Sequence, residues 1–265
     1  MAIFKLNDSG PGVKRLQTAL QGAGFNPGVI DGSFGPGTLA AVIGFQKSQE
    51  LVPDGVAGVR TQAALGMIKV TKLPDITASV TSEKVSKMFP GTFIGNIKTH
   101  LPNVLSALKA AGIGDRLMVL MALGTIRAET AQFAPISEGI SGFNTSSNSH
   151  PFDLYDNRED LGNKGEPDGD RYKGRGFVQL TGRSNYRRIG KKIGVGLEAN
   201  PDLANDSAIA SQILAAFLQA VEIEVKTALA DGDLGAARKL VNGGSHGLGE
   251  FETTYHLGEQ QFPEG

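Results

Sequence analysis

The sequence predicts a mainly α-helical protein in two parts, a small three-helix module and a larger helical domain with a long polar loop. Apolar residues recur three and four positions apart within residues 1–66 and again from residue 81, which is the spacing of helices with one buried face. A glycine-rich turn segment occurs twice in the first part. Between residues 131 and 173 the helical spacing disappears, and glycine, asparagine, serine, aspartate and proline dominate.

The composition limits the classes of protein. Hydrophobic residues make up 40% and charged residues 20% of the 265 residues, as expected for a globular protein with a substantial core. The 26 lysines and arginines balance 27 acids, so we expect no nucleic-acid partner. No stretch approaches eighteen uninterrupted apolar residues, so we expect no membrane anchor. We also expect a monomer. The absence of cysteine excludes a disulfide framework and a thiol nucleophile. With only four scattered histidines, we expect no metal and no cofactor.

The repeat defines the first part. Residues 31–38, DGSFGPGT, are echoed 23 residues later by residues 54–61, DGVAGVRT. Each copy runs from an Asp-Gly turn through a further glycine to a threonine, which we expect to be the N-cap of a helix. Helical spacing is present at Val13, Leu16 and Leu20 and at Leu39, Val42, Ile43, Phe45 and Gln46. Three short helices therefore account for residues 1–66.

Residues 67–80, MIKVTKLPDITASV, contain proline, threonine and serine without helical spacing. We interpret them as a linker; the alternative is a connecting strand within a single domain. The predicted boundaries are then 1–66 for the module, 67–80 for the linker and 81–265 for the larger domain.

Four segments with helical spacing dominate the larger domain: 82–88, 96–111, 115–130 and 207–229. Asp115 and either Asp206 or Ser207 are expected to cap two of these helices. The polar stretch after the third segment is longer than most loops of compact domains, and loops of this length are usually functional or disordered. The residues with the most chemical content flank it.

Two glutamates stand at the start of this loop. Glu129 ends an apolar helical segment and shares its expected inward face with Met118, Met121, Ala122 and Thr125. Partial desolvation there would raise the pKa of the carboxyl and suit it to general acid catalysis. Glu138 follows in a turn, and a second carboxylate about 6.5–9.5 Å from the first would activate a water, as in inverting glycosidases. The alternative is that both are ordinary solvated surface residues.

A second cluster follows the loop, at residues 172–186, YKGRGFVQLTGRSNY. Its glycines allow close backbone approach, and Gln179, Thr181 and Asn185 offer neutral donors and acceptors suited to sugar hydroxyls. Thr181 is a candidate to hold the attacking water. The alternative is a turn with a structural arginine. A third cluster, NGGSHG at 242–247, is a polar turn that alone would be an ordinary loop.

Together the three clusters resemble the lysozyme and chitinase group known as glycoside hydrolase family 19, over about residues 85–262. GRGFVQLTGRSNY is similar to the family's GRG-x-x-Q-L-[ST] and NY signature, and RAET resembles the helix end that carries the general acid, with Ala128 where the family often has histidine. VNGG at 241–244 resembles the family's substrate loop. The resemblance implies that Glu129 is the acid and that Thr181 holds the water. It implies substrate binding by Arg175, Gln179, Asn185, Tyr186 and Asn242.

The second carboxylate has several candidates. Chitinases of the family place the base further along the chain, where Pro151 stands here with Asp153 and Asp156 nearest. Phage lysozymes of the group resemble this chain in having a glutamate nine residues after the acid, which corresponds to Glu138. We prefer Glu138 as the base and keep Asp153 and Asp156 as alternatives.

The first part resembles the three-helix peptidoglycan-binding module of wall-degrading enzymes, on DGSFGPGT and the Phe45-Gln46 pair. By analogy, the wall-binding groove would include Asp31, Gly32, Phe34 and Asp54, although the same residues also make the turns.

Both resemblances imply a phage-type endolysin, a muramidase that hydrolyses the β-1,4 bond between N-acetylmuramic acid and N-acetylglucosamine with inversion. Peptidoglycan is then the expected partner. The alternatives are a chitinase acting on N-acetylglucosamine polymers and a non-catalytic wall-binding structural protein of a phage. Because MAIFKLNDSG lacks the features of a secretory signal, we expect synthesis in the host cytoplasm and holin-assisted release to the wall, in the periplasm or outside the cell.

Overall fold

A computed structural model describes residues 3–49, 51–68, 73–147, 149–242, 244 and 247–263. The chain forms two compact units, Met1–Lys72 and Leu73–Gly265. Within the described residues both units are built from helices, and the two strands are two residues long each. The predicted mainly α class is confirmed.

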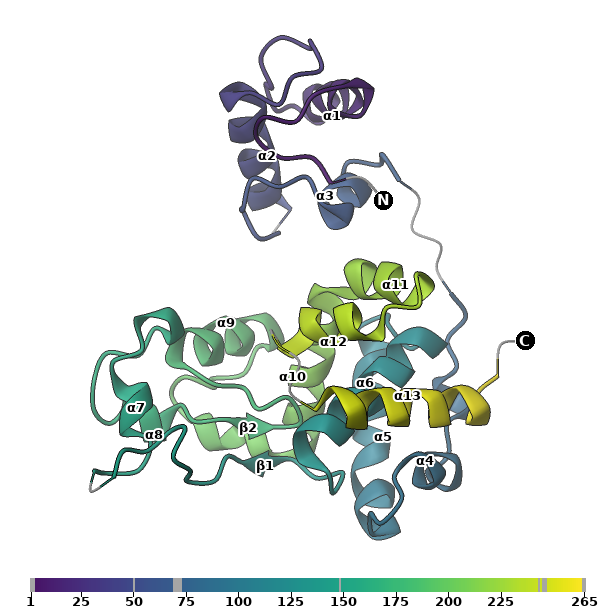
Figure 1. Ribbon diagram of the computed structural model, residues 1–265, viewed down its shortest axis with the longest axis vertical. Coiled ribbons are helices and arrows are strands. Elements are labelled where there is room, and N and C mark those ends of the chain that lie inside the picture. Colours follow the sequence, from purple (N-terminus) through teal and green to yellow (C-terminus); the bar gives the residue numbers. More distant parts are fainter. Residues whose placement is uncertain are drawn as a thin grey trace. The chain divides into compact units, whose positions relative to one another are not determined.

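The smaller unit consists of three helices, as predicted: α1 (Pro11–Gly22), α2 (Pro36–Ser48) and α3 (Val59–Ala64) (Figure 1). Their buried apolar side chains form one core, which includes Val13, Leu16, Leu20, Val42 and Phe45. The expected caps are wrong. Helices α2 and α3 begin earlier, after Gly35 and Gly58, and the two threonines lie inside the helices and are buried.

Each repeat is closed by a buried glutamine. The Gln17 side-chain amide nitrogen lies within 3.2 Å of acceptors that include Asp31 Oδ1 and Thr38 Oγ1, and its oxygen accepts from the Gly32 amide at 2.8 Å. The second copy has the same arrangement, with the amide of Gln46 donating to the following residues: Asp54, Val56 and Thr61. The sequence repeat is therefore a structural repeat in which a helix side chain wraps an Asp-Gly turn.

Part of the predicted linker packs onto the larger unit. Residues 69–72 lie outside the described residues. Asp75 forms an isolated antiparallel bridge with Asp115, a short 3-10 helix spans Thr77–Ser79, and Val80 is buried in the core of the larger unit. The segment that precedes helix α4 (Ser82–Met88) is therefore anchored to the start of helix α6 (Arg116–Thr130) rather than extended in solvent.

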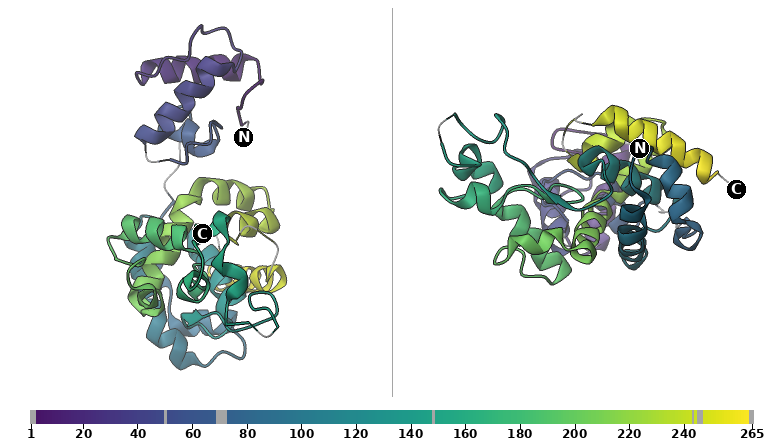
Figure 2. Two further views of the ribbon diagram at one scale, coloured as in Figure 1. Left: turned by 90° about the vertical axis from the view of Figure 1, so that its left-hand side faces the viewer. Right: turned by 90° about the horizontal axis from the view of Figure 1, so that it is seen from below.

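The larger unit is organised around one buried helix. Helix α6 (Arg116–Thr130) is buried on all sides between Met118 and Ile126, as expected for a helix that is apolar all round. Helices α13, α10, α11 and α5 pack against it, and α13 runs beside it in both figures (Figures 1 and 2). Outside the long loop, the other described α-helices of this unit are α4 (Ser82–Met88), α5 (Ile94–Ala110), α9 (Arg183–Ile193), α10 (Ser207–Ala220), α11 (Glu222–Ala230), α12 (Leu234–Asn242) and α13 (Leu248–Gln261).

The predicted helices are largely confirmed, with one correction. Asp115 and Asp206 cap α6 and α10 through their side chains, as expected. The single helix predicted for 207–229 is wrong, because the chain bends by 67° between α10 and α11. No single described helix is long and apolar enough to cross a membrane, although this bent pair meets the criteria of length and composition when its two halves are taken together.

The long polar loop contains short ordered elements at the end of the unit that also carries α9 (Figure 1). Strand β1 (Ile136–Ser137) pairs antiparallel with β2 (Arg175–Gly176), so the two ends of the loop are joined. Between them lie α7 (Asp153–Asp156), the 3-10 helix Glu159–Leu161 and α8 (Asp168–Arg171).

Candidate active site

Glu129 lies in the last turn of α6 and forms an ion pair with Arg238 of α12. Its Oε1 atom is 2.6 Å from Nη2 of the arginine, which is fully buried, whereas the glutamate side chain is 14% exposed. We expected this carboxylate to be partly desolvated among apolar residues. Its side chain is largely buried, and a buried guanidinium that was not expected fixes one oxygen of the carboxylate. The other oxygen has no hydrogen-bond partner among the described residues.

The turn after α6 is tightly held. Ala131 and Phe133 have positive φ angles of 49° and 55°, which non-glycine residues seldom adopt. The Phe133 ring is buried, with its centroid 4.9 Å from that of Phe89 and 6.2 Å from that of Phe177. The carbonyl of Ala131 accepts from Arg127 at 2.9 Å. This packing fixes the path from Glu129 to strand β1.

Glu138 directly follows β1 and is anchored by three donors. Its Oε1 accepts from Asn144 Nδ2 and from the Tyr155 hydroxyl, both at 2.9 Å. Its Oε2 accepts from the backbone amide of Gly174 at 3.2 Å. Burial, followed by the bond to Glu138, raises the pKa of Tyr155 to about 12, so this phenol remains a donor at neutral pH.

The turn that follows β2 carries the second cluster. Arg175 and Leu180 exchange backbone hydrogen bonds, at 3.2 and 2.9 Å, which closes the turn. Gln179 sits at its tip with a φ of 50°, and its side-chain amide donates to the carbonyls of Ile136 and Gly176. The hydroxyl of Thr181 donates to the Gln179 carbonyl at 2.8 Å. The turn is thus tied to both strands.

Three side-chain oxygens converge on the face of Gly174. A Cβ atom at this glycine would lie 2.8 Å from Gln179 Oε1 and 3.2 Å from both Glu138 Oε2 and Thr181 Oγ1. The three predicted residues are therefore within reach of one small molecule, and the glycine is required because a side chain would enter the space between them. The Thr181 hydroxyl donates its hydrogen to the Gln179 carbonyl, so toward the space beside Gly174 its oxygen can act only as an acceptor.

Two residues predicted to bind substrate lie inside the protein. Arg175 is 5% exposed and Tyr186 is fully buried. The arginine donates to the tyrosine hydroxyl at 3.1 Å, and that hydroxyl donates to the Lys173 carbonyl at 2.8 Å. Asn185 donates to the Thr181 carbonyl at 2.9 Å. These contacts give the three residues a positioning role beneath the turn, and direct substrate binding by the first two gains no support.

The alternative carboxylates are used elsewhere in the loop. Asp153 Oδ1 accepts from the Ser146 amide at 2.7 Å, and this backbone bond lowers the pKa of the aspartate. Asp156 is buried, accepts from the Gly169 amide at 2.8 Å and lies 3.1 Å from His150. Both therefore stabilise the loop, and Glu138 alone of the three candidates contacts the turn at Gly174.

Asn242 ends α12, and its side-chain oxygen accepts from the Gly244 amide at 3.0 Å. Residue 243 of the predicted substrate loop (241–244) and residues 245 and 246 of the third cluster (242–247) lie outside the described residues. No group of three or more histidine, cysteine, aspartate or glutamate side chains within the described ranges is arranged to hold a metal ion.

The predicted wall-binding residues form the turns of the smaller unit. Phe34 is buried, and Gly32 has a φ of 82° that a side chain would strain. Asp31 accepts from the Ser33 amide at 2.8 Å, and this bond, followed by the one from Gln17, lowers the pKa of its carboxyl. Asp54 accepts from Val56 in the same way. Their side chains are therefore committed to the turns, and wall binding by them stays a prediction.

The residues that hold the two carboxylates in place were not predicted from the sequence. Arg238 is 109 residues from its partner, and no local pattern links the two. Asn144 and Tyr155 lie in the loop between the clusters and resemble its other polar residues. Gly174 belongs to the motif at residues 172–186, and its position next to Arg175 was the one sequence feature that could have indicated its role in the site.

Comparisons with known families agree with this arrangement. Residues 9–65 match the family described as putative peptidoglycan binding domain, and residues 130–235 match glycoside hydrolase family 19, described as chitinase class I. The chain carries both family segments. The two resemblances are thereby confirmed, and the second supports a glycosidase. Its match begins just after Glu129 and ends just before Arg238.

Individual relatives share only segments of the chain. A probable N-acetylmuramoyl-L-alanine amidase of Bacillus licheniformis is 36% identical over 109 residues, which are 37% of this chain and 30% of that protein. The acidic 26 kDa endochitinase of Solanum lycopersicum is 57% identical over 44 residues, 16% of this chain and 17% of that protein. The chain thus spans less than a third of either relative. The crystal structure of chitinase C from Streptomyces griseus HUT6037 is 18% identical, covers 69% of this chain and 76% of its own, and has a TM-score of 0.47.

Proposed function

We propose that the protein is a peptidoglycan hydrolase that cleaves the β-1,4 bond between N-acetylmuramic acid and N-acetylglucosamine by acid and base catalysis. The convergence of Glu138, Gln179 and Thr181 oxygens beside Gly174 carries the proposal, because a water bound between these oxygens would have both a proton acceptor and a second hydrogen-bond partner. The separate peptidoglycan-binding segment favours the cell wall as substrate, since it raises the local concentration of the enzyme on the polymer. As an endolysin, it would reach the wall from the host cytoplasm after holin-assisted release.

The roles follow from the hydrogen bonds. The water donates one hydrogen to Thr181 Oγ1 and the other to Glu138 Oε2, which leaves an oxygen lone pair for attack on the anomeric carbon. Glu138 takes up a proton as the water attacks. Glu129, which must enter the reaction protonated on the oxygen that Arg238 does not hold, gives that proton to the leaving glycosidic oxygen. Arg238 holds one oxygen of Glu129 and leaves the other for the substrate. Displacement of the glycosidic oxygen by water from the opposite face inverts the anomeric centre.

The test is mass spectrometry of the muropeptides released from purified sacculi. We expect a new reducing end on muramic acid and an inverted anomer in the first minutes of the reaction. A reducing end on glucosamine, or an anhydro product, would reject the proposed bond or the proposed chemistry. A Glu138→Gln variant is the matched control, because it removes the base and keeps a side chain of the same shape.

A chitinase is the second candidate. The family described as chitinase class I matches residues 130–235, and this favours an N-acetylglucosamine polymer as substrate. Release of reducing ends from colloidal chitin, with none from sacculi, would select it. A wall-binding structural protein without activity would release no ends from either polymer and would still sediment with sacculi.

A further inference from the structure

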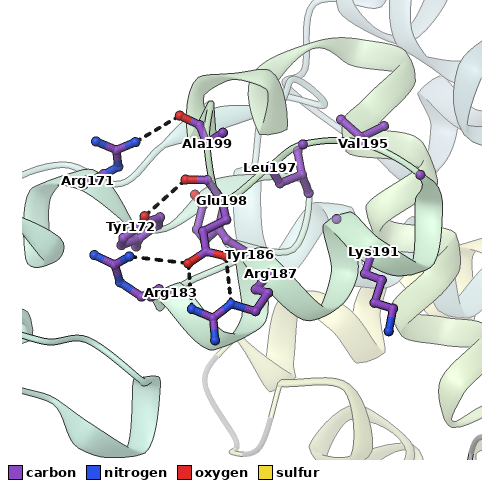
Figure 3. Close-up of a pocket in the computed structure, with 13 residues that line it drawn as sticks. Arg171, Tyr172, Arg183, Tyr186, Arg187, Lys191, Val195, Leu197, Glu198 and Ala199 are labelled. Atoms are coloured by element: carbon purple, nitrogen blue, oxygen red, sulfur yellow. Dashed lines mark hydrogen bonds and ion pairs between the residues drawn. The ribbon is translucent and has the colours of Figure 1, made fainter.

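A cavity of about 760 Å³ lies beside α9 and α8, and neither Glu129 nor Glu138 lines it (Figure 3). Helix α9 carries five basic residues among its 11 and no acidic residue, in a chain of net charge −1. Arg183, Arg187 and Lys191 are spaced four apart, so they share one helix face, and all three line the cavity. Arg171 of α8 joins them, and Glu198 is the single acidic residue in the lining.

Nearby acidic residues neutralise only part of the positive charge that lines the cavity. Glu198 pairs with Arg187 through two bonds of 2.7 Å, and these hold the pKa of its carboxyl down to about 2, so it is ionised at neutral pH. Arg183 is held mainly by Asp168, which lies buried behind it. Arg171 and Lys191 have no carboxylate within ion-pairing distance among the described residues. Figure 3 shows Lys191 extending away from the pairs around Glu198.

The cavity is built on the same segment as the candidate water site. Its lining includes Tyr172 and Tyr186, which are buried. The Tyr172 carbonyl accepts from the Gly182 amide at 2.8 Å, which ties the cavity wall to the end of the turn. Arg183 follows Thr181 by two residues, so their backbones are at most about 7 Å apart. An extended peptide of four residues spans roughly 13 Å, which covers the distance from Thr181 to Arg183. Lys191 lies eight residues beyond Arg183, about 12 Å further along α9, so its charge acts at the far end of the cavity.

We propose that this cavity binds the carboxylates of the peptide stem carried by muramic acid, which deepens the function proposed above and rests on it. The stem is an acidic peptide, whereas chitin is neutral, so a cationic cavity beside the glycan site would distinguish the two polymers. A volume of about 760 Å³ is large enough for a short peptide. Arg171 and Lys191 supply charges that no ion pair among the described residues neutralises, although Arg171 also donates to the Ala199 carbonyl at 3.0 Å. A guanidinium suits a planar carboxylate.

The test compares intact sacculi with sacculi whose stems have been removed by an amidase. The full chain is measured as wild type, as the double variant Arg171→Gln/Lys191→Gln, and as a control, Lys87→Gln/Lys109→Gln, which removes two exposed charges from α4 and α5. We expect the ratio of kcat/KM on intact to stripped glycan to fall roughly five-fold in the first variant only, which corresponds to about 1 kcal/mol. Exposed ion pairs seldom contribute more than this. Added salt would reduce the wild-type ratio toward that of the variant.

Each other outcome overturns the proposal in a distinct way. An unchanged ratio with activity on both substrates would reject the stem site and leave the hydrolase function standing. Equal loss on both substrates would identify a structural role for the cavity. Binding to phosphatidylglycerol vesicles that the double variant loses, with an unchanged ratio, would replace the peptide by a lipid surface. Absence of wild-type activity on both sacculus preparations, with activity on chitin, would reject the proposed peptidoglycan hydrolase and select the chitinase.

Discussion

The Asp-Gly turns of the smaller unit and the turn after β2 in the larger unit contain similar residues, but their polar side chains have different partners. In the smaller unit, the carboxylate of Asp54 and the amide of Gln46 form hydrogen bonds within the turn itself. In the larger unit, oxygens of Glu138 and Thr181 face the same space at Gly174. A glycine-rich polar motif is therefore a candidate binding site only where its polar atoms point toward a common space and are not all hydrogen-bonded within the turn.

The largest effect is expected from Glu129→Gln, which removes the proposed acid but keeps an oxygen to accept from Arg238. Because general acid catalysis contributes about 10²–10⁴-fold, we expect kcat on sacculi to fall by roughly that factor. Clearing of permeabilised cells measures the rate, and thermal unfolding checks the fold. Glu250→Gln, an exposed position on α13, is the control. Clearing by Glu129→Gln at the wild-type rate would contradict the role of this residue.

The next effect separates the candidate bases. Glu138→Gln is expected to lower kcat by about 10²-fold, because the water loses its proton acceptor. Asp153→Asn is expected to keep kcat within a few-fold, roughly, and to lower the melting temperature instead, since Asp153 accepts from the Ser146 amide. A large loss of kcat in Asp153→Asn with little loss in Glu138→Gln would identify Asp153 as the base. The turn at Gly174 would then have no catalytic carboxylate and would not differ in this respect from the turns of the smaller unit.

Much of the framework was predictable from the sequence because it is local. Segment 82–88 is observed as α4, and Asp115 and Asp206 cap their helices, since periodicity and capping depend on neighbouring residues. The bend at Val221 was not predictable, because the apolar spacing continues through it and the break depends on what each helix packs against.

The site was predictable in its residues and less in their environment. The sequence motif identified Gln179 and Thr181 as site residues, and the structure places their oxygens near that of Glu138 beside Gly174. It did not indicate that Arg175 and Tyr186 face inward, because a motif does not record which side chains are exposed. The partner of Glu129 is Arg238, and only the packing of α12 near the end of α6 brings these distant residues into contact.

A smaller effect tests the turns of the first unit. In Gln46→Ala, the Gly55 amide and the oxygens around it lose a buried partner, so we expect the smaller unit to lose about 1–3 kcal/mol of stability. Retention on sacculi would fall, while kcat on soluble glycan fragments would be unchanged. Gln21→Ala, at an exposed position on α1, is the matched control. Loss of kcat in Gln46→Ala would show that these turns influence catalysis directly.

The smallest effect concerns acid stability at Glu198. Bonds from Arg187 lower the pKa of its carboxyl from the ordinary 4.5 to about 2 in the folded protein. Because the folded pKa is depressed, the stabilisation is complete above pH 4.5 and is lost as the pH falls toward 2. We expect Glu198→Gln to melt at most roughly 2–4 °C below wild type at pH 6, since partly exposed pairs contribute little. That gap should shrink by pH 3, as followed by circular dichroism, whereas a gap that widens in acid would place the stabilising charge on another carboxylate.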